Sequence, residues 1–147
     1  MDRQDAERFL AKVGEGPDKG FPLLEAALAC AVHEDPARDA DEVRDLAAEA
    51  VERLTARLKD ESPEEALAET MAGDMRLAGD LITYDHPANT DVISVAQRRK
   101  GLPVTLGVFY LDVAARCGLD VKGVDFPGHF LLRIETVEGP LALDPFS

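Results

Sequence analysis

The sequence contains few of the residues that most often carry metal or disulfide chemistry. Its 147 residues include two cysteines and three histidines. Cys30 and Cys117 form no spaced motif with any histidine, so we expect no metal site. A glycine-rich phosphate loop is missing as well, and we expect no cofactor. The two thiols are expected to be buried and reduced, as in a cytoplasmic protein, rather than joined in a disulfide.

Positive charge and long apolar runs are also scarce. Lys and Arg number 16 against 29 Asp and Glu, which gives a formal net charge of −13. This charge argues against nucleic acid or an anionic membrane as the main partner, and leaves open a solvated surface or a basic partner. No apolar stretch approaches the roughly 18 residues of a membrane-spanning helix, and the polar N-terminus is unlike a secretory signal. We expect a cytoplasmic protein.

The hydrophobic pattern changes near residue 100, from helix signals to strand signals. Ser62, Pro63 and Glu65 are typical of a capping box at a helix start. The helix that begins at Pro103 is apolar nearly all round, which indicates a central helix packed on several sides. We predict helices over about 5–13, 22–33, 41–59, 62–71, 91–100 and 103–117, and strands over 121–126, 129–135 and 141–143.

These elements predict a single α+β domain. A helical N-terminal part over 1–72 packs on a core over 73–147, in which the helix over 103–117 lies against a small antiparallel sheet over 121–144.

His129 and Asp144 are the candidate catalytic pair. The connection over 136–140 is short enough for a hairpin, which would bring Asp144 back close to His129. A carboxylate that faces an imidazole fixes its tautomer and stabilises its charged form, as in a nucleophile–base–orienter triad. The alternative is structural, because a histidine at a strand start often only makes a hydrogen bond and an aspartate before proline is a common turn residue.

No cysteine stands where the nucleophile of such a triad is expected. A reactive thiol is usually placed at a helix N-terminus, where the helix dipole lowers its pKa. That position is Pro103 here, and Cys117 lies at the other end of the helix, about 20 Å away at 1.5 Å per residue. Thr105 in the first turn could act through its hydroxyl, but a threonine inside a helix usually bonds to its own backbone.

A short basic run, Arg98-Arg99-Lys100, stands out against the acidic chain. It precedes Gly101 and ends a predicted helix. The run either compensates the dipole at the helix C-terminus or forms a small site for an anion or a peptide carboxylate.

At these residues the chain resembles the SirB family of bacterial transglutaminase-like proteins. The matching segments are HPANTDVISVAQRRKGLPVTLGVFYLDVAARCGL, VKGVDFPGHFLLRI and LALDPF, with weaker similarity back to about Phe21. The resemblance implies a papain-like, transglutaminase-type core in which His129 takes the histidine place and Asp144 the aspartate place. The cysteine place falls at or next to Pro103. Family members often continue past the DPF segment into a helical, repeat-like region, so the chain is either a short member or a fragment.

A His–Asp pair without a thiol suggests a pseudoenzyme. The leading hypothesis is a catalytically degenerate domain that binds a protein or peptide partner in the old active-site groove. The candidate binding residues lie in the matched segments: Pro103, Gly128, Arg98, Arg99 and Asn89. The alternative is acyl transfer or amide or ester hydrolysis, with Thr105 or a water activated by His129. A third reading is a structural domain in which His129 and Asp144 only brace the sheet.

Overall fold

Helices form the first part of the chain and an antiparallel sheet the last part, so the expected α+β class is confirmed. The computed structural model describes residues 23–126 and 129–146, and the helix expected over 5–13 lies outside them. The α-helices are α2 (Leu23–Glu34), α3 (Asp41–Arg57), α4 (Pro63–Ala68), α5 (Val92–Arg98) and α6 (Pro103–Arg116). The sheet contains β3 (Val121–Phe126), β4 (His129–Thr136) and β5 (Gly139–Leu143). Shorter elements are the π-helix η1 (Glu69–Asp74), the 3-10 helix η2 (Pro87–Thr90) and the strands β1 (Ala78–Gly79) and β2 (Lys100–Gly101).

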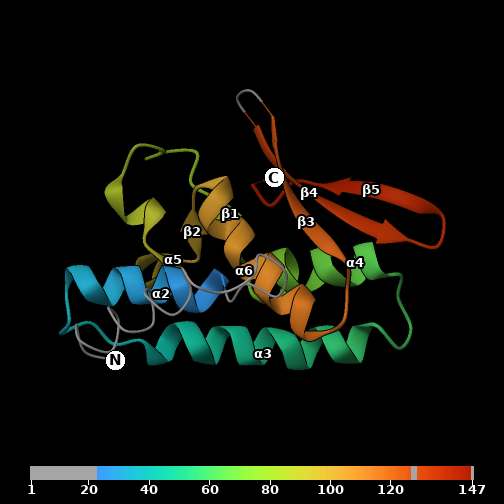
Figure 1. Cartoon of the computed structure of the whole chain (residues 1–147), viewed down its shortest axis with the longest axis horizontal. Coiled ribbons are helices and arrows are strands. Elements are labelled where there is room, and N and C mark those ends of the chain that lie inside the picture. Colours follow the sequence, from blue (N-terminus) through green and yellow to red (C-terminus); the bar gives the residue numbers. More distant parts are fainter. Residues whose placement is uncertain (1–22, 127–128, 147) are drawn as a thin grey trace, which may run out of the picture.

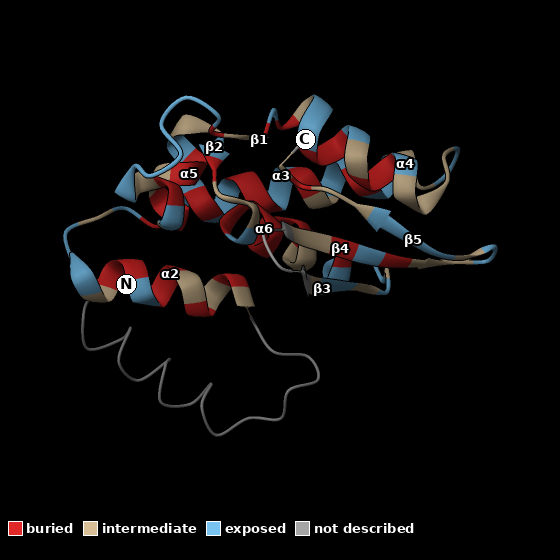
Figure 2. Ribbon diagram, turned by 90° about the horizontal axis from the view of Figure 1, so that it is seen from above, coloured by how far each residue is buried: buried red, intermediate tan, exposed pale blue. Residues whose placement is uncertain are grey.

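Helix α6 is the central element, as its apolar sequence predicts. It contacts α2, α3 and α5 on the helical side and both β3 and β4 on the sheet side. Its side chains Leu106, Phe109 and Val113 are fully buried. Figure 1 shows α6 running between the long helix α3 and the sheet, and Figure 2 shows that buried residues concentrate where α6 meets its neighbours.

The sheet has the order β3–β4–β5 with both pairs antiparallel. In β4, Leu132 and Ile134 are fully buried on the helix side, whereas Arg133 between them is exposed. This is the period-two alternation of a strand with one face on the core. Residues 137 and 138 form a two-residue turn between Thr136 and Gly139, whose positive φ of 114° suits glycine.

Two glycines let the sheet approach α6 closely. A Cβ on Gly107 of α6 would lie 2.5 Å from Cε1 of Phe130, and one on Gly123 of β3 would lie 2.8 Å from Cζ of the same ring. The Phe130 ring therefore fits between a helix and a strand only because both positions lack a side chain. This contact fixes the start of β4 against α6.

Two local predictions in the first half differ from the structure. The helix expected over 62–71 is α-helical only to Ala68 and continues as the π-helix η1. The expected capping box is wrong, because Ser62 makes no capping hydrogen bond and its Oγ is buried without a partner among the described residues. Pro63 does occupy the start of α4 as predicted.

The segment over 73–90 contains a pairing that no local pattern indicated. β1 and β2 form a two-residue parallel ladder in which Ala78 lies opposite Lys100 and Gly79 opposite Gly101. The ladder holds this segment against the residues that lead into α6. None of the described helices is long and apolar enough to cross a membrane.

Candidate functional site

Two of the predicted site residues, Pro103 and Thr105, lie in the first turn of α6. Leu102 has an extended backbone, and its C=O accepts the first helical hydrogen bond from Leu106 N–H at 2.9 Å. Pro103 is the first helical residue, where its missing N–H costs no hydrogen bond. In this first turn Val104 points outward with 58% of its surface exposed, whereas Thr105 is 6% exposed. Among the described residues no hydrogen bond from the Thr105 hydroxyl is found, so the expected bond to its own backbone is absent there.

His129 begins β4, and its backbone lies opposite Phe126 of β3. The contact of Phe130 with Gly107 brings this end of β4 against α6. Gly128 and the side chain of His129 lie outside the described part of the chain. The prediction of a catalytic or binding role for both residues therefore stays a prediction.

Asp144 follows β5 and lies near the same end of β4. The β4–β5 ladder ends where Leu132 pairs with Leu143. One more step of that ladder would set the backbone of Asp144 opposite Leu131, two residues from the backbone of His129, or about 7 Å along the strand. Asp144 Oδ1 also accepts a hydrogen bond from the Phe146 N–H at 2.9 Å, which is the turn role considered for an aspartate before proline.

Tyr110 is a further residue near this carboxylate. Its side chain is 2% exposed, and burial together with the negative charge of Asp144 raises the pKa of Tyr110 to about 12. The phenol is therefore protonated at neutral pH and keeps its hydrogen-bond donor. Sequence reasoning did not single out Tyr110, and only the fold places it near enough to Asp144 to be affected by its charge.

A buried polar network holds the loop over 81–86 beside α6. Asp80 is 3% exposed and accepts hydrogen bonds from the N–H groups of Ile82 and Thr83, from the Thr83 hydroxyl and from Arg98 at 3.0 Å. These bonds, with those of Thr83 first, hold the pKa of Asp80 well below its usual range. Asp80 is thus a charged carboxylate that fixes the fold of the loop.

Asn89 completes this network from within the protein. Its side chain is fully buried, donates to the carbonyls of Thr83 and Tyr84, and accepts a hydrogen bond from Arg98 at 3.0 Å. Because their side chains bond within the fold, Asn89 and Arg98 are placed to position the loop. Direct contact of either with a ligand stays a prediction.

Arg99 ends α5 in a left-handed backbone conformation with φ of 62°. Its Nε donates to the carbonyl of Ala96 in the last turn, and its terminal nitrogen donates to the Met75 carbonyl at 2.7 Å. The bond to Ala96 is an interaction with a carbonyl at a helix C-terminus, which is one of the two roles considered for the basic run Arg98-Arg99-Lys100. Lys100 continues into β2.

The last described residues pack against β1 and the loop over 81–86. Phe146 lies over Gly79, where an added Cβ would be 2.3 Å from the ring, and its carbonyl accepts a hydrogen bond from Gly79 N–H at 3.3 Å. The ring also makes an edge-on contact with Tyr84, with centroids 5.9 Å apart. The segment that follows β5 thus packs onto β1 and onto the loop over 81–86.

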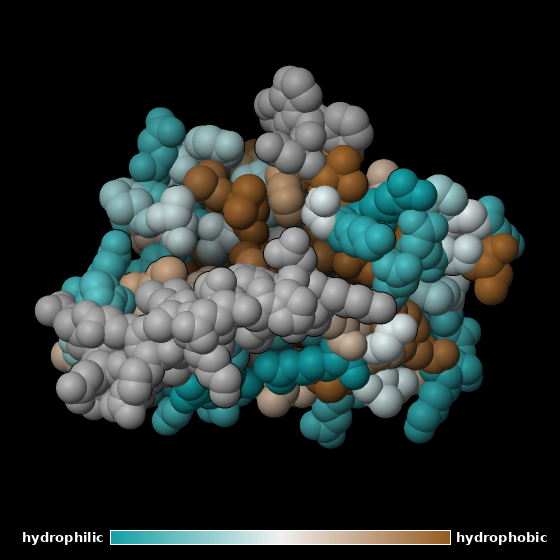
Figure 3. Space-filling model, viewed as in Figure 1, coloured by the Kyte–Doolittle hydropathy of each residue, from teal (hydrophilic) through white to brown (hydrophobic). Residues whose placement is uncertain are grey.

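Apolar side chains are exposed around this end of the molecule. Ile82 is 89% exposed, and most of the strongly exposed large hydrophobic residues in the described chain lie either on the loop or in the first turn of α6. We call this set the apolar rim: Leu81, Ile82, Tyr84 and Val104. Figure 3 shows hydrophobic surface over the upper end of α6, next to the loop and the sheet. Exposed apolar side chains that gather at one place are typical of an interaction surface.

The cysteines lie away from the first turn of α6, and both are free as expected. Cys117 follows α6 and packs against the core, with its sulfur near the Val51 carbonyl. The prediction that Cys30 is buried is wrong. Cys30 is exposed and lines a hollow of about 510 Å³ between α2 and η2. The described residues include no group of three or more His, Cys, Asp or Glu that could hold a metal ion.

Comparison with known proteins connects this geometry to a family. The model of the transglutaminase-like superfamily matches residues 39–147. The chain is 34% identical over 134 residues to a UPF0162 protein of Xylella fastidiosa, an alignment that covers 88% of this chain and 48% of the relative. A UPF0162 protein of Vibrio cholerae is 38% identical over 71 residues, which cover 48% of this chain and 26% of that protein.

A shorter similarity reaches a eukaryotic protein. Mouse F-box only protein 21 is 36% identical over 59 residues, which cover 40% of this chain and 9% of that protein. The chain spans about half the length of the UPF0162 protein of Xylella fastidiosa. No solved structure gives a significant match.

Proposed function

Because the chain belongs to the transglutaminase-like superfamily, we propose that it is a catalytically degenerate domain that binds a protein or peptide next to the N-terminal end of α6. In this proposal it is a cytoplasmic binding or regulatory module of the SirB type. His129 and Asp144 are a remnant pair that shapes the site, and no covalent step takes place there.

The observation that carries the proposal is the apolar rim beside a helix start without a thiol. The first turn of α6 carries Pro103, Val104 and Thr105, so the place that favours a thiolate has no sulfur. Ile82 and Val104 at the same end are 89% and 58% exposed. Burying a side chain of this size contributes about 1.5–3 kcal/mol to a complex. Several contacts of the rim with a partner therefore offset part of the roughly 4–15 kcal/mol that association costs in lost translational and rotational freedom.

The loop that carries most of the rim is held in place before any partner arrives. The side chains of Asp80 and Asn89 make hydrogen bonds to the backbone of the loop and hold it in place. The ring of Phe146 packs against Tyr84 of the same loop. A preorganised surface loses less conformational entropy on binding than a flexible one does. This network therefore supports recognition through the loop.

The test is selection from a random library of linear 12-residue peptides, followed by affinity measurement with matched surface variants. Ile82→Asp adds a negative charge to the rim, and Val137→Asp adds the same charge to the exposed turn between β4 and β5. We expect Ile82→Asp to weaken binding of the selected peptides at least tenfold and Val137→Asp to leave it unchanged. His129→Ala should weaken binding as well. Equal affinities for the two aspartate variants would overturn the proposal.

The hydrolase alternative is separated by a second readout on the same proteins. Thr105 lies in the first turn of α6, where a hydroxyl nucleophile would stand. Hydrolysis of p-nitrophenyl acetate that is lost in both Thr105→Val and His129→Ala would replace the binding proposal with catalysis. Under the binding proposal, wild type and both variants hydrolyse the ester at the same background rate.

A further inference from the structure

The outer edge of β5 is an unpaired strand edge in the described chain. The sheet order is β3–β4–β5, so β5 pairs with β4 on one side only. Glu135 N–H donates to the Asp120 carbonyl, which shows that the backbone groups of Glu135 point toward β3. Along an antiparallel strand these directions alternate, so Ile134 and Leu132 bond to Leu141 and Leu143.

This alternation determines which backbone groups of β5 are available for hydrogen bonds at its outer edge. The backbone groups of the residues between those bonded positions, Pro140 and Ala142, point away from β4. Proline has no N–H, so the free edge offers the carbonyl of Pro140 and both the N–H and the carbonyl of Ala142. These three groups are enough to pair with a short extended peptide.

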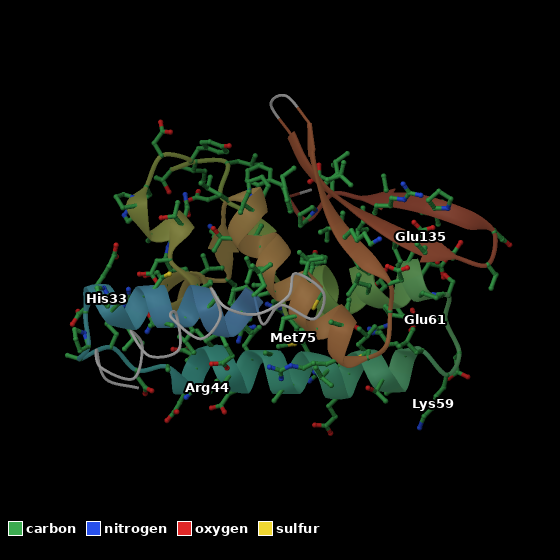
Figure 4. The ribbon with its side chains drawn as sticks, in the orientation of Figure 1. His33, Arg44, Lys59, Glu61, Met75 and Glu135 are labelled. Atoms are coloured by element: carbon green, nitrogen blue, oxygen red, sulfur yellow. The ribbon has the colours of Figure 1, made fainter. Side chains whose placement is uncertain are left out.

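An acidic groove runs along this edge. A groove of about 510 Å³ lies between α4 and β5, and its charged lining consists of one arginine and four glutamates. The arginine, Arg57, is held by Asp74 through two hydrogen bonds of 2.9 and 3.0 Å and by Glu61 at 2.9 Å. Figure 4 shows Glu61 below the sheet, at the α4 end of the molecule. The other glutamates are Glu64, Glu65 and Glu69.

The interior of the groove combines apolar contact surface with an unused polar atom. Leu141 and Leu143 line it from the strand and Ala68 from the helix, and Leu141 is 42% exposed. The Oε2 atom of Glu64 is buried and has no hydrogen-bond partner among the described residues. A buried carboxylate oxygen without a donor is costly, and a cationic group that reached it would satisfy it.

We propose that the β5 edge and this groove bind an extended peptide that carries lysine or arginine at alternate positions. The peptide pairs with Ala142 as an added antiparallel strand. The residues on either side of the one opposite Ala142 then point to the face of Leu141 and Leu143, which is the groove side. Their aliphatic stems pack on the two leucines and their charged ends meet the glutamates.

The spacing of the basic side chains on the peptide matches the spacing of the glutamates in the groove. Residues two apart in a strand lie about 6.6 Å apart on one face. Glu65 and Glu69 are four residues apart across the α4–η1 junction, so their Cβ atoms lie about 6 Å apart. A basic-x-basic segment therefore aligns two cations with two carboxylates. The chain's net charge of −13 favours the approach of such a peptide.

The experiment measures fluorescence anisotropy of the labelled pentapeptide Thr-Lys-Val-Lys-Thr with the whole chain. The charge-reversed peptide Thr-Glu-Val-Glu-Thr is the matched control, and titration to about 2 mM captures affinities near 1 mM. We expect saturable binding of the lysine peptide only, weakened by raising NaCl from about 0.05 to 0.5 M because salt screens the charges. Equal anisotropy changes for the two peptides, or none for either, would overturn the proposal.

Two variants locate the binding. Ala142→Pro removes the edge N–H at a position where proline is tolerated, because that N–H makes no bond within the sheet. The double variant Glu65→Gln, Glu69→Gln removes the charges and leaves the strand intact. Each should lower the affinity at least fivefold with an unchanged melting temperature. Unchanged affinity in a folded Ala142→Pro variant would contradict strand pairing. Ile82→Asp should leave this peptide's affinity unchanged, which separates the groove from the apolar rim.

Discussion

Replacing Gly107 by alanine sets two effects of known size against each other. Glycine inside a helix costs about 0.8–1 kcal/mol relative to alanine, so helix propensity alone predicts that Gly107→Ala stabilises the protein. The added Cβ would lie 2.5 Å from Cε1 of Phe130, about 1 Å closer than an ordinary contact. The ring has no room to retreat because Gly123 of β3 approaches it from the sheet side.

Overpacking of this kind costs about 1–3 kcal/mol. The two effects together give a net loss of about 1 kcal/mol in the free energy of unfolding, or roughly 3–5 °C in melting temperature for a chain of this size. Urea denaturation at neutral pH measures the first quantity and calorimetry the second. The displaced ring also moves the neighbouring His129 backbone, so binding at the apolar rim should weaken with stability.

A double-mutant cycle tests the cause. In a Phe130→Leu background the added Cβ has more space, so Gly107→Ala should become neutral or stabilising by up to about 1 kcal/mol. Gly73→Ala is the control, because its added Cβ meets only the flexible Glu69 carboxylate, at 3.3 Å. If Gly107→Ala raises the melting temperature equally with and without Phe130, the packing argument is refuted.

Two other predictions concern single side chains. The pKa of Asp80 is lowered in the folded state, so its stabilising effect is complete above the unfolded pKa of about 3.9 and is lost as the pH falls toward the folded value. Asp80→Asn should therefore lower the melting temperature at pH 7 and flatten its fall below about pH 4, and an unchanged acid limb would contradict a role for this carboxylate. With a thiol reagent such as dithionitrobenzoate, Cys30 should react fast and Cys117 slowly, because Cys30 is exposed and Cys117 is half-buried. Equal rates in the Cys30→Ser and Cys117→Ser variants would show that the exposures are wrong.

The elements around the site could be predicted because their signals are local. The alternation in β4, the hairpin connection predicted over 136–140 and the proline that begins α6 are each marked within a few residues, although the turn itself takes only residues 137 and 138. The strands β3 and β4 and the helix α6 therefore start and end within about one residue of their predicted bounds. Apolar side chains on nearly all sides of α6 also predicted its central position.

The parts that sequence reasoning missed depend on contacts between distant residues. Arg98 meets Asp80 across 18 positions, and no periodic pattern marks such a pair. The β1–β2 ladder is two residues long, too short for a strand signal. Cys30 was assigned to the core because alanines surround it, although the buried stripe of α2 at Leu24 and Leu28 leaves Cys30 off that face.

The central claim is that the N-terminal end of α6 binds a protein or peptide and has no catalytic nucleophile. Mass spectrometry of the protein after treatment with a hydroxyl-directed fluorophosphonate and with iodoacetamide tests it most directly, with His129→Ala and Cys117→Ser as controls. The account predicts no fluorophosphonate adduct on Thr105, and iodoacetamide labelling of Cys30 that His129→Ala does not change. An adduct on Thr105 that disappears in His129→Ala would show a working nucleophile and contradict the account.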